Sequence, residues 1–212
     1  MNTDDLIASI SAELTPCRPG LMTAWVIRGV ILGLVITAVS FAAFWGVRPN
    51  VIVIVIDPAL FAKSALPLLL GALALPSMLA QARPAGKSWS TAACAVVAIL
   101  LGLIILATLY LTPYQQWWAD MVGNSITICL MSIPVLSVPI LAGALIALRR
   151  GAPEHPSRCG AVAGLVAAGF GAAIYSLFCI EDSPLFYGVW YTLSIFIVTL
   201  IGAVAGRSLL RW

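Results

Sequence analysis

Apolar residues fill six long stretches of the chain, and short polar segments separate these stretches. They cover residues 24–46, 60–82, 89–111, 126–148, 160–178 and 187–205. Each is close to the roughly 20 residues that a helix needs to cross the hydrocarbon core of a bilayer. A shorter β-branched run, VIVIVI at residues 51–56, is too short to cross and is expected in the loop after the first span. The pattern predicts an all-α polytopic membrane protein with six transmembrane helices.

The composition excludes the common classes of soluble protein. Of the 212 residues, 62% are hydrophobic and only 9% are charged, whereas about 25% of a soluble domain is charged. An ordinary cytosolic enzyme, a disordered regulator and a secreted disulfide scaffold are therefore excluded. The formal net charge of +3 is small and scattered, so nucleic acid is not expected as a partner. The acidic opening MNTDDL also argues against a cleavable signal peptide.

The basic residues divide unevenly between the two sides that six spans define. With the N-terminus in the cytoplasm, nine Lys and Arg residues fall on or near the cytoplasmic side, and only Arg48 and Lys63 fall outside. The positive-inside rule therefore places both termini in the cytoplasm. Arg28 and Lys63 lie near span ends, where we expect their side chains to extend to the membrane interface.

The spans offer little catalytic or ion-conducting chemistry. No Asp or Glu lies in the middle of a span, and the sequence contains no HExxH, GxSxG or phosphate-loop motif. A proton-coupled pump, an ion channel and a membrane protease are therefore disfavoured. The single histidine, His155, is interpreted as a solvated loop residue. We expect no catalytic residues and no resident cofactor.

The polar segment before the first span has the pattern of a short amphipathic helix. Asn2 or Thr3 can cap it, and acidic residues in its first turn favour the positive end of the helix dipole. The acidic residues are Asp4 and Asp5, and the apolar stripe is Leu6, Ile7, Ile10 and Leu14. An acidic face without Lys or Arg suits a basic groove on a protein partner better than an anionic membrane surface. Resting on the membrane surface is the alternative.

Two of the five cysteines are predicted to share one level of the membrane. Cys129 and Cys179 both fall near the outer ends of consecutive spans, and Glu181 and Asp182 follow the second cysteine. Two sulfurs with nearby carboxylates can form a disulfide, a redox switch or a soft-metal site. Spacing alone leaves these three alternatives open.

Small residues recur at the spacing that lets transmembrane helices approach closely. The motif Gly-x-x-x-Gly occurs at residues 29–33, 160–164 and 202–206. We interpret the three motifs as packing within the six-helix bundle, with a homodimer face as the alternative.

Several short motifs follow one another in a specific order. They are TDDLI at 3–7, RPAG at 83–86, LRRGAP at 148–153, CIEDSP at 179–184, and GRSLLRW at 206–212, with Phe186, Trp190 and Tyr191 following the fourth. In this order the chain resembles, over its whole length, the NrsF family of six-span bacterial inner-membrane anti-sigma factors. These are negative regulators of an extracytoplasmic-function sigma factor.

The resemblance implies a mechanism. In the family the cytoplasmic N-terminal segment holds the sigma factor, which would assign this role to Asp4, Asp5, Leu6, Ile7, Ile10 and Leu14. Cys129 and Cys179 would be the periplasm-facing sensor pair for heavy-metal or oxidant stress, with Glu181 and Asp182 as accessory residues. A transient heavy-metal ion would bind to the same two cysteines. The family commonly has His before the second cysteine, where this chain has Phe178, and this favours thiol oxidation or modification over direct chelation.

We therefore expect a membrane-bound anti-sigma factor that is not an enzyme. Residues 1–20 would form the cytoplasmic sigma-binding segment, and residues 21–212 the six-helix sensor domain in the bacterial inner membrane. The expected partners are an extracytoplasmic-function sigma factor and the lipid bilayer, with a homodimer as a further assembly. One alternative is a small transporter or channel-like protein for an apolar or metal substrate. Another is a membrane thiol-redox enzyme that uses the same two cysteines.

Overall fold

The computed structural model describes residues 3–12, 20–49, 52, 56–83 and 90–211. Within these residues, six helices are long and apolar enough to cross a membrane. They are α2 (Leu21–Phe44), α4 (Pro58–Gln81), α5 (Ser90–Leu111), α7 (Ile126–Leu148), α8 (Pro156–Ser176) and α9 (Pro184–Leu209). The all-α prediction and the six predicted spans are confirmed.

Two shorter helices with described bounds, α1 (Thr3–Ala12) and α6 (Trp117–Val122), lie outside the predicted spans. The helix α1 occupies the N-terminal segment, with Asp4 and Asp5 in its first turn as predicted. The helix α6 lies between α5 and α7 and has no counterpart in the sequence analysis. Leu14 of the predicted tail helix, Val51 and residues 53–55 of the VIVIVI run, and Cys17 lie outside the described residues.

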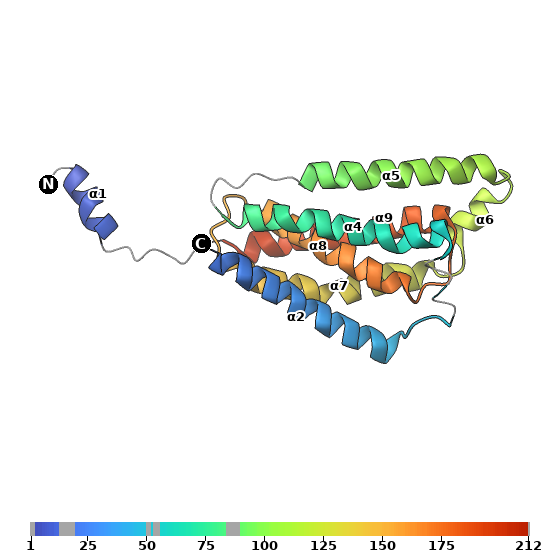
Figure 1. The fold of residues 1–212 in the computed structure, drawn as a ribbon, viewed down its shortest axis with the longest axis horizontal. Helices are drawn as coiled ribbons and strands as arrows, with labels where there is room; N and C mark the ends of the chain where they lie inside the picture. The colour runs from blue at the N-terminus through green and yellow to red at the C-terminus, as the bar shows by residue number, and fades with distance from the viewer. Residues whose placement is uncertain (1–2, 13–19, 50–51, 53–55, 84–89, 212) are drawn as a thin grey trace.

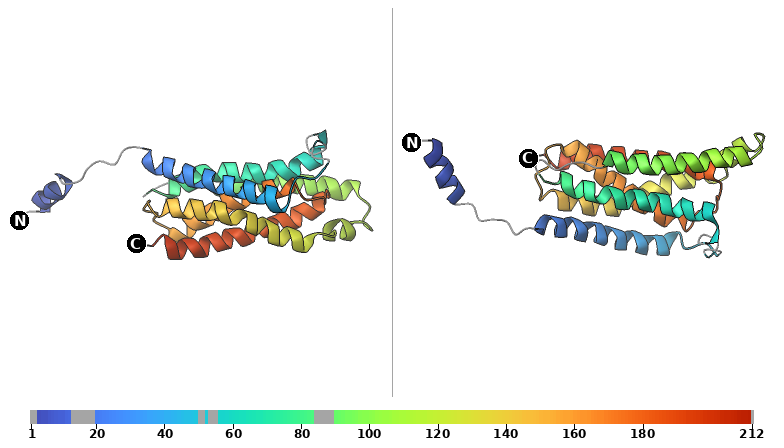
Figure 2. Two further views of the ribbon diagram at one scale, coloured as in Figure 1. Left: turned by 90° about the horizontal axis from the view of Figure 1, so that it is seen from below. Right: turned by 45° about the horizontal axis from the view of Figure 1, so that its top comes forward.

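The six long helices run side by side and form one bundle (Figure 1). The central helix is α8, which packs against α4, α7 and α9, while α2 packs on α7. The helix α5 lies on the outside against α4 and α9 (Figure 2). The start of α2 and the end of α9 lie at one end of the bundle, hereafter the termini end, and α6 lies at the other, the α6 end (Figure 1).

The Gly-x-x-x-Gly motifs are used inside the bundle. An added Cβ at Gly206 would lie 2.6 Å from the Pro156 carbonyl oxygen, and one at Gly164 would lie 2.7 Å from the Val198 carbonyl oxygen. Gly29 of α2 and Gly143 of α7 would likewise collide with each other's backbone. Glycine at these positions therefore lets α8 approach α9, and α2 approach α7, at backbone distance, as the interpretation of bundle packing predicts.

Candidate functional site

Cys129 and Cys179 belong to one buried cluster at the α6 end. Cys129 lies in the first turn of α7 and is fully buried, and Cys179 follows α8 and is 2% exposed. The same cluster contains Tyr175, Phe186 and Tyr191. The two cysteines share this cluster, and both are free thiols. The structure thus brings together the pair that the sequence predicts at one level.

The connection between α8 and α9 fixes the backbone of Cys179. After α8 ends at Ser176, the backbone N–H groups of Phe178 and Cys179 still donate to the Tyr175 carbonyl, at 3.0 and 3.1 Å. The chain then runs outside helical structure until Pro184 opens α9, where a missing N–H is tolerated. Cys179 therefore lies on a short connection whose other polar groups need partners from elsewhere in the bundle.

Lys63 supplies most of these partners. Its side chain comes from α4 and is almost completely buried, with 2% of the residue exposed. The ammonium donates to the backbone carbonyls of Cys179 and Glu181, both at 2.7 Å, and lies 3.4 Å from the Asp182 Oδ1 atom. A buried ammonium is tolerated only when such acceptors surround it. Lys63 therefore holds the cysteine-bearing connection against α4.

Arg48 makes a second attachment from the segment that follows α2. Its Nη1 atom lies 2.8 Å from the Asp182 Oδ1 atom and 3.4 Å from the Cys179 carbonyl oxygen. Its backbone N–H donates to the Leu177 carbonyl at 3.1 Å. The connection between α8 and α9 is thus tied to α2 as well as to α4. We call Lys63, Arg48 and Asp182 the polar clamp.

The polar clamp is not among the sequence-based predictions, and the expectation that Lys63 extends to the membrane interface is wrong. Lys63 does not extend to the membrane interface, because backbone carbonyls and Asp182 surround its ammonium inside the bundle. The signal was available in the sequence: Arg48 and Lys63 are the two basic residues at the side that is otherwise without them. An ionisable residue within an apolar span usually has a specific partner.

The two predicted accessory carboxylates face other groups. Glu181 accepts hydrogen bonds from the Asn124 backbone N–H at 2.9 Å and from the Ser125 hydroxyl at 3.3 Å. The Asp182 carboxylate faces the clamp cations. The Cys179 sulfur lies 3.9 Å from the backbone carbonyl oxygen of Glu181. Its contact is therefore with the backbone of Glu181 and not with the carboxylate. Among the described residues, no three His, Cys, Asp or Glu side chains form a metal-binding group.

Aromatic rings enclose the sulfurs. The centroids of Tyr175 and Tyr191 are 5.9 Å apart, and those of Tyr187 and Tyr191 are 6.3 Å apart. Tyr175 and Tyr191 both lie close to Cys179. The Tyr191 hydroxyl is buried and has no hydrogen-bond partner among the described residues. The pair is therefore shielded from water on its aromatic side, which limits access by water-soluble reagents.

The other two described cysteines lie apart from this cluster. Cys94 is exposed on α5, and Cys159 is buried in α8 near the termini end, away from Cys129 and Cys179. Both environments agree with their interpretation as small apolar residues. His155 is exposed directly before α8.

Of the predicted partner-binding residues, all but Leu14, which lies outside the described residues, belong to α1, beyond the termini end of the bundle (Figure 1). Asp4 and Asp5 are exposed, and Ile7 is 60% exposed. The described bundle therefore leaves this apolar side chain without cover. At the termini end itself, the Arg150 guanidinium lies 3.7 Å from the centroid of the Trp25 ring, and Arg83 donates to the Thr23 hydroxyl at 2.9 Å.

Comparison with known proteins shows the family of the chain. The family model described as NrsF, negative regulator of sigma F, matches residues 10–212. The chain belongs to the NrsF family. It is 31% identical to the anti-sigma-F factor NrsF of Caulobacter vibrioides and 29% identical to the probable anti-sigma-F factor NrsF of Azospira oryzae. Each match covers 100% of both chains. No solved structure matches the chain.

Membership of the NrsF family confirms the predicted resemblance and gives the chain a regulatory rather than a catalytic role. A sigma factor is the partner that this role implies. The family match begins at residue 10, so it includes the whole bundle and the end of α1.

Proposed function

We propose that the chain is an inner-membrane anti-sigma factor that holds an extracytoplasmic-function sigma factor through residues 1–20. It releases the factor when Cys129 and Cys179 react with an oxidant or a heavy-metal ion. The observation that carries this proposal is the combination of an NrsF-family bundle with a buried pair of free thiols at one end and an uncovered acidic helix at the other.

The charge distribution supports an orientation with the termini end in the cytoplasm. The basic residues of the described bundle gather at that end, namely Arg28, Arg83, Arg149, Arg150, Arg158, Arg207 and Arg211. At the α6 end the described basic residues are Arg48 and Lys63, and both are used inside the structure. Basic residues favour the cytoplasmic side of a membrane. The α6 end, with the cysteine pair, would then face the periplasm.

The proposed signal acts on the two thiols by one of two reactions, oxidation or metal binding. In oxidation, Cys129 and Cys179 form one sulfur–sulfur bond and lose two protons and two electrons to the oxidant. In metal binding, a thiophilic divalent ion bridges two thiolates, and two protons are released. Both reactions draw the Cys179 connection towards α7, which carries Cys129. The periplasm is an oxidising compartment, so it permits the disulfide.

The clamp offers a path from the thiols to the tail. Arg48 follows directly after α2, and the sigma-binding segment directly precedes the same helix. A shift of the Cys179 connection therefore acts on Arg48 and, through it, on α2. Because α2 packs on α7 through Gly29 and Gly143, it can slide only along a well-fitted surface. An allosteric response needs two sites and an element with two positions, and we propose α2 as this element.

A retention experiment tests the holding step. The full chain and a variant without residues 1–15 are placed in nanodiscs, and each is incubated with the extracytoplasmic-function sigma factors of its bacterium. We expect the full chain to retain one of them and the truncated chain to retain none. A truncated chain that holds the sigma factor as well as the full chain would overturn the role of the segment. If neither chain retains a sigma factor, the proposed function is wrong.

A further inference from the structure

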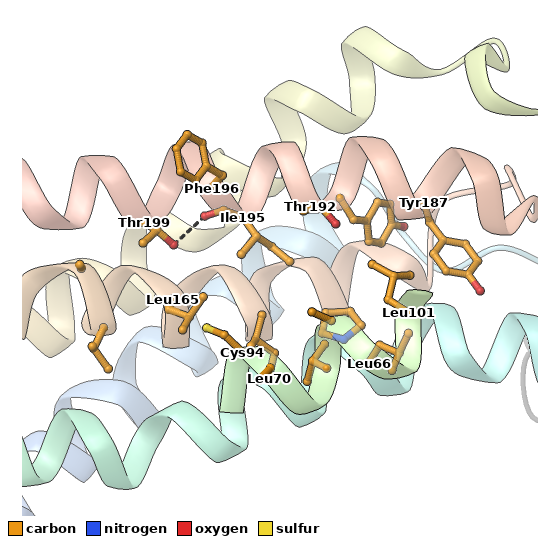
Figure 3. Close-up of a pocket in the computed structure, with 17 residues that line it drawn as sticks. Leu66, Leu70, Cys94, Leu101, Leu165, Tyr187, Thr192, Ile195, Phe196 and Thr199 are labelled. Atoms are coloured by element: carbon orange, nitrogen blue, oxygen red, sulfur yellow. Dashed lines mark hydrogen bonds between the residues drawn. The ribbon is translucent and has the colours of Figure 1, made fainter. Parts of the chain in front are cut away.

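A large apolar cavity opens between α4, α5, α8 and α9 (Figure 3). Its volume is about 750 Å³, within the range of about 300–1,000 Å³ that small-molecule sites occupy. Leu66 and Leu70 of α4 and Leu165 of α8 lie on its inner side and are buried. Leu101 of α5 and Ile195 of α9 also line the cavity (Figure 3).

Small side chains create this space. Ala95 and Ala98 of α5 and Ala161 of α8 line the cavity, and larger residues at these positions would fill it. Towards the α6 end, α5 touches α9, since an added Cβ at Gly188 would lie 2.8 Å from Ile105. Farther along α5, a Cβ added at Gly102 would meet nothing within 4 Å. Farther along the helix, the buried Val97 also packs on the bundle core, so α5 contacts the bundle on both sides of Gly102.

The lining is mainly apolar and suits a hydrocarbon chain, with Tyr187, Tyr191, Thr192 and Thr199 as the residues that carry a hydroxyl group. Thr199, one of the few polar residues of the wall, donates its hydroxyl to the Ile195 carbonyl of its own helix at 2.8 Å (Figure 3). Water is poorly held in an apolar cavity, because each molecule needs two to four polar partners. A void of this size also deprives its lining of dispersion contacts. Only an apolar occupant restores these contacts.

The mouth of the cavity faces the side of the bundle that a bilayer would cover. Phe196 at the rim is 57% exposed and Cys94 is also exposed, and both lie on membrane-spanning helices. The occupant with direct access is therefore a lipid tail. We propose that the cavity binds one acyl chain of a membrane phospholipid, with the head group remaining at the bilayer surface.

An occupied cavity would bear on the cysteine cluster. Tyr187 and Tyr191 line the cavity and also belong to the buried cluster that contains Cys129 and Cys179. Tyr191 lies close to Cys179. The acyl chain would thus press on the wall that shields the thiols. Chain binding does not depend on the proposed sigma-factor function, and a failure of either leaves the other standing.

Photolabelling of the full chain tests the site. The protein is placed in nanodiscs that contain a phospholipid with a diazirine in its acyl chain, illuminated, and analysed by mass spectrometry. We expect labels on the buried inner residues Val162 and Leu165 as well as on outward residues such as Val204, which is 72% exposed. Labels on Val204 without labels on Val162 and Leu165 would overturn the proposal.

A filled cavity provides the matched comparison. Ala98→Phe places a ring in the space, and we expect labelling of Val162 and Leu165 to fall about tenfold, equivalent to about 1.4 kcal/mol of lost binding. Ala107→Phe adds the same ring to an exposed position of α5 outside the cavity, and labelling should stay unchanged. Should Ala98→Phe fail to fold, Ala161→Phe fills the cavity from α8. Unchanged labelling of Val162 and Leu165 in a folded Ala98→Phe or Ala161→Phe variant would contradict the proposal. It would also be contradicted if an added diazirine fatty acid labelled these two residues and the phospholipid did not.

Discussion

The two ends of the bundle are held together by different interactions. At the α6 end, Lys63 and Arg48 bind the Cys179 connection through hydrogen bonds and ion pairs. At the termini end, α8 and α9 approach through glycines at backbone distance, with Gly206 beside the Pro156 carbonyl. Hydrogen bonds can exchange partners when a neighbouring group moves, whereas close-packed backbones cannot. The α6 end is therefore suited to respond to chemistry, and the termini end to move as a unit.

Removal of both thiols should have the largest effect on the difference between the two ends of the bundle. In Cys129→Ser/Cys179→Ser, we expect stress-induced release of the sigma factor to be lost, because neither a disulfide nor a metal bridge can form. Retention in the unstressed state should stay unchanged, since serine keeps the side-chain shape. The measurement is sigma-factor retention in nanodiscs before and after cadmium or an oxidant. Cys94→Ser, on an exposed thiol of α5, is the control, and a responsive double variant would refute the assignment.

Removal of the clamp ammonium should have the next largest effect. Lys63→Met leaves two buried carbonyls and Asp182 with fewer partners. Breaking a buried charged interaction from one side costs about 3 kcal/mol or more. We expect the variant to unfold at lower denaturant concentration in detergent micelles. Arg28→Met removes an exposed cation near the termini end and should change stability little. Equal stability of the two variants would mean that the polar clamp does not stabilise the bundle.

A single methyl group added at a glycine contact should lower the stability of the bundle. An added Cβ at Gly202 would collide with the Gly160 carbonyl and lie 2.9 Å from the Gly164 Cα atom. Overpacking of this kind costs about 1–3 kcal/mol, so Gly202→Ala should lower the thermal unfolding temperature. Gly102→Ala faces open space and should be neutral or stabilising. If both variants behave alike, the termini end is not held by backbone contact.

Much of the fold was predictable because the bilayer imposes a simple rule. Each span needs an uninterrupted apolar stretch of fixed length, and this located all six membrane-spanning helices to within a few residues. The same rule cannot find α6, which is too short to span and is not apolar throughout. The Gly-x-x-x-Gly motifs were also assigned correctly to bundle packing, since the close contacts of Gly164 and Gly206 join helices of one chain.

The site was predictable only in part. Depth along the spans placed Cys129 and Cys179 at one level, but their shared cluster depends on how α7, α8 and α9 pack, which depth does not determine. The role of Lys63 was missed because a lysine near a span end usually extends to the interface. Its actual acceptors are backbone carbonyls more than 100 positions later in the chain, and backbone acceptors leave no mark in a sequence.

The smallest expected effect is that of removing the acidic charges of α1, which lies beyond the termini end. Asp4 and Asp5 are exposed on α1, and exposed ion pairs contribute at most about 1 kcal/mol each. Asp4→Asn/Asp5→Asn should therefore weaken sigma-factor retention about fivefold, measured as the dissociation constant at low salt, and the difference should shrink at high salt because screening already weakens these charges. Glu154→Gln changes an exposed acid at the termini end outside α1 and should leave the constant unaltered. An equal loss in both variants would show that net charge, rather than the acidic face of α1, sets the affinity, and that the apolar stripe with Ile7 carries the specific contact.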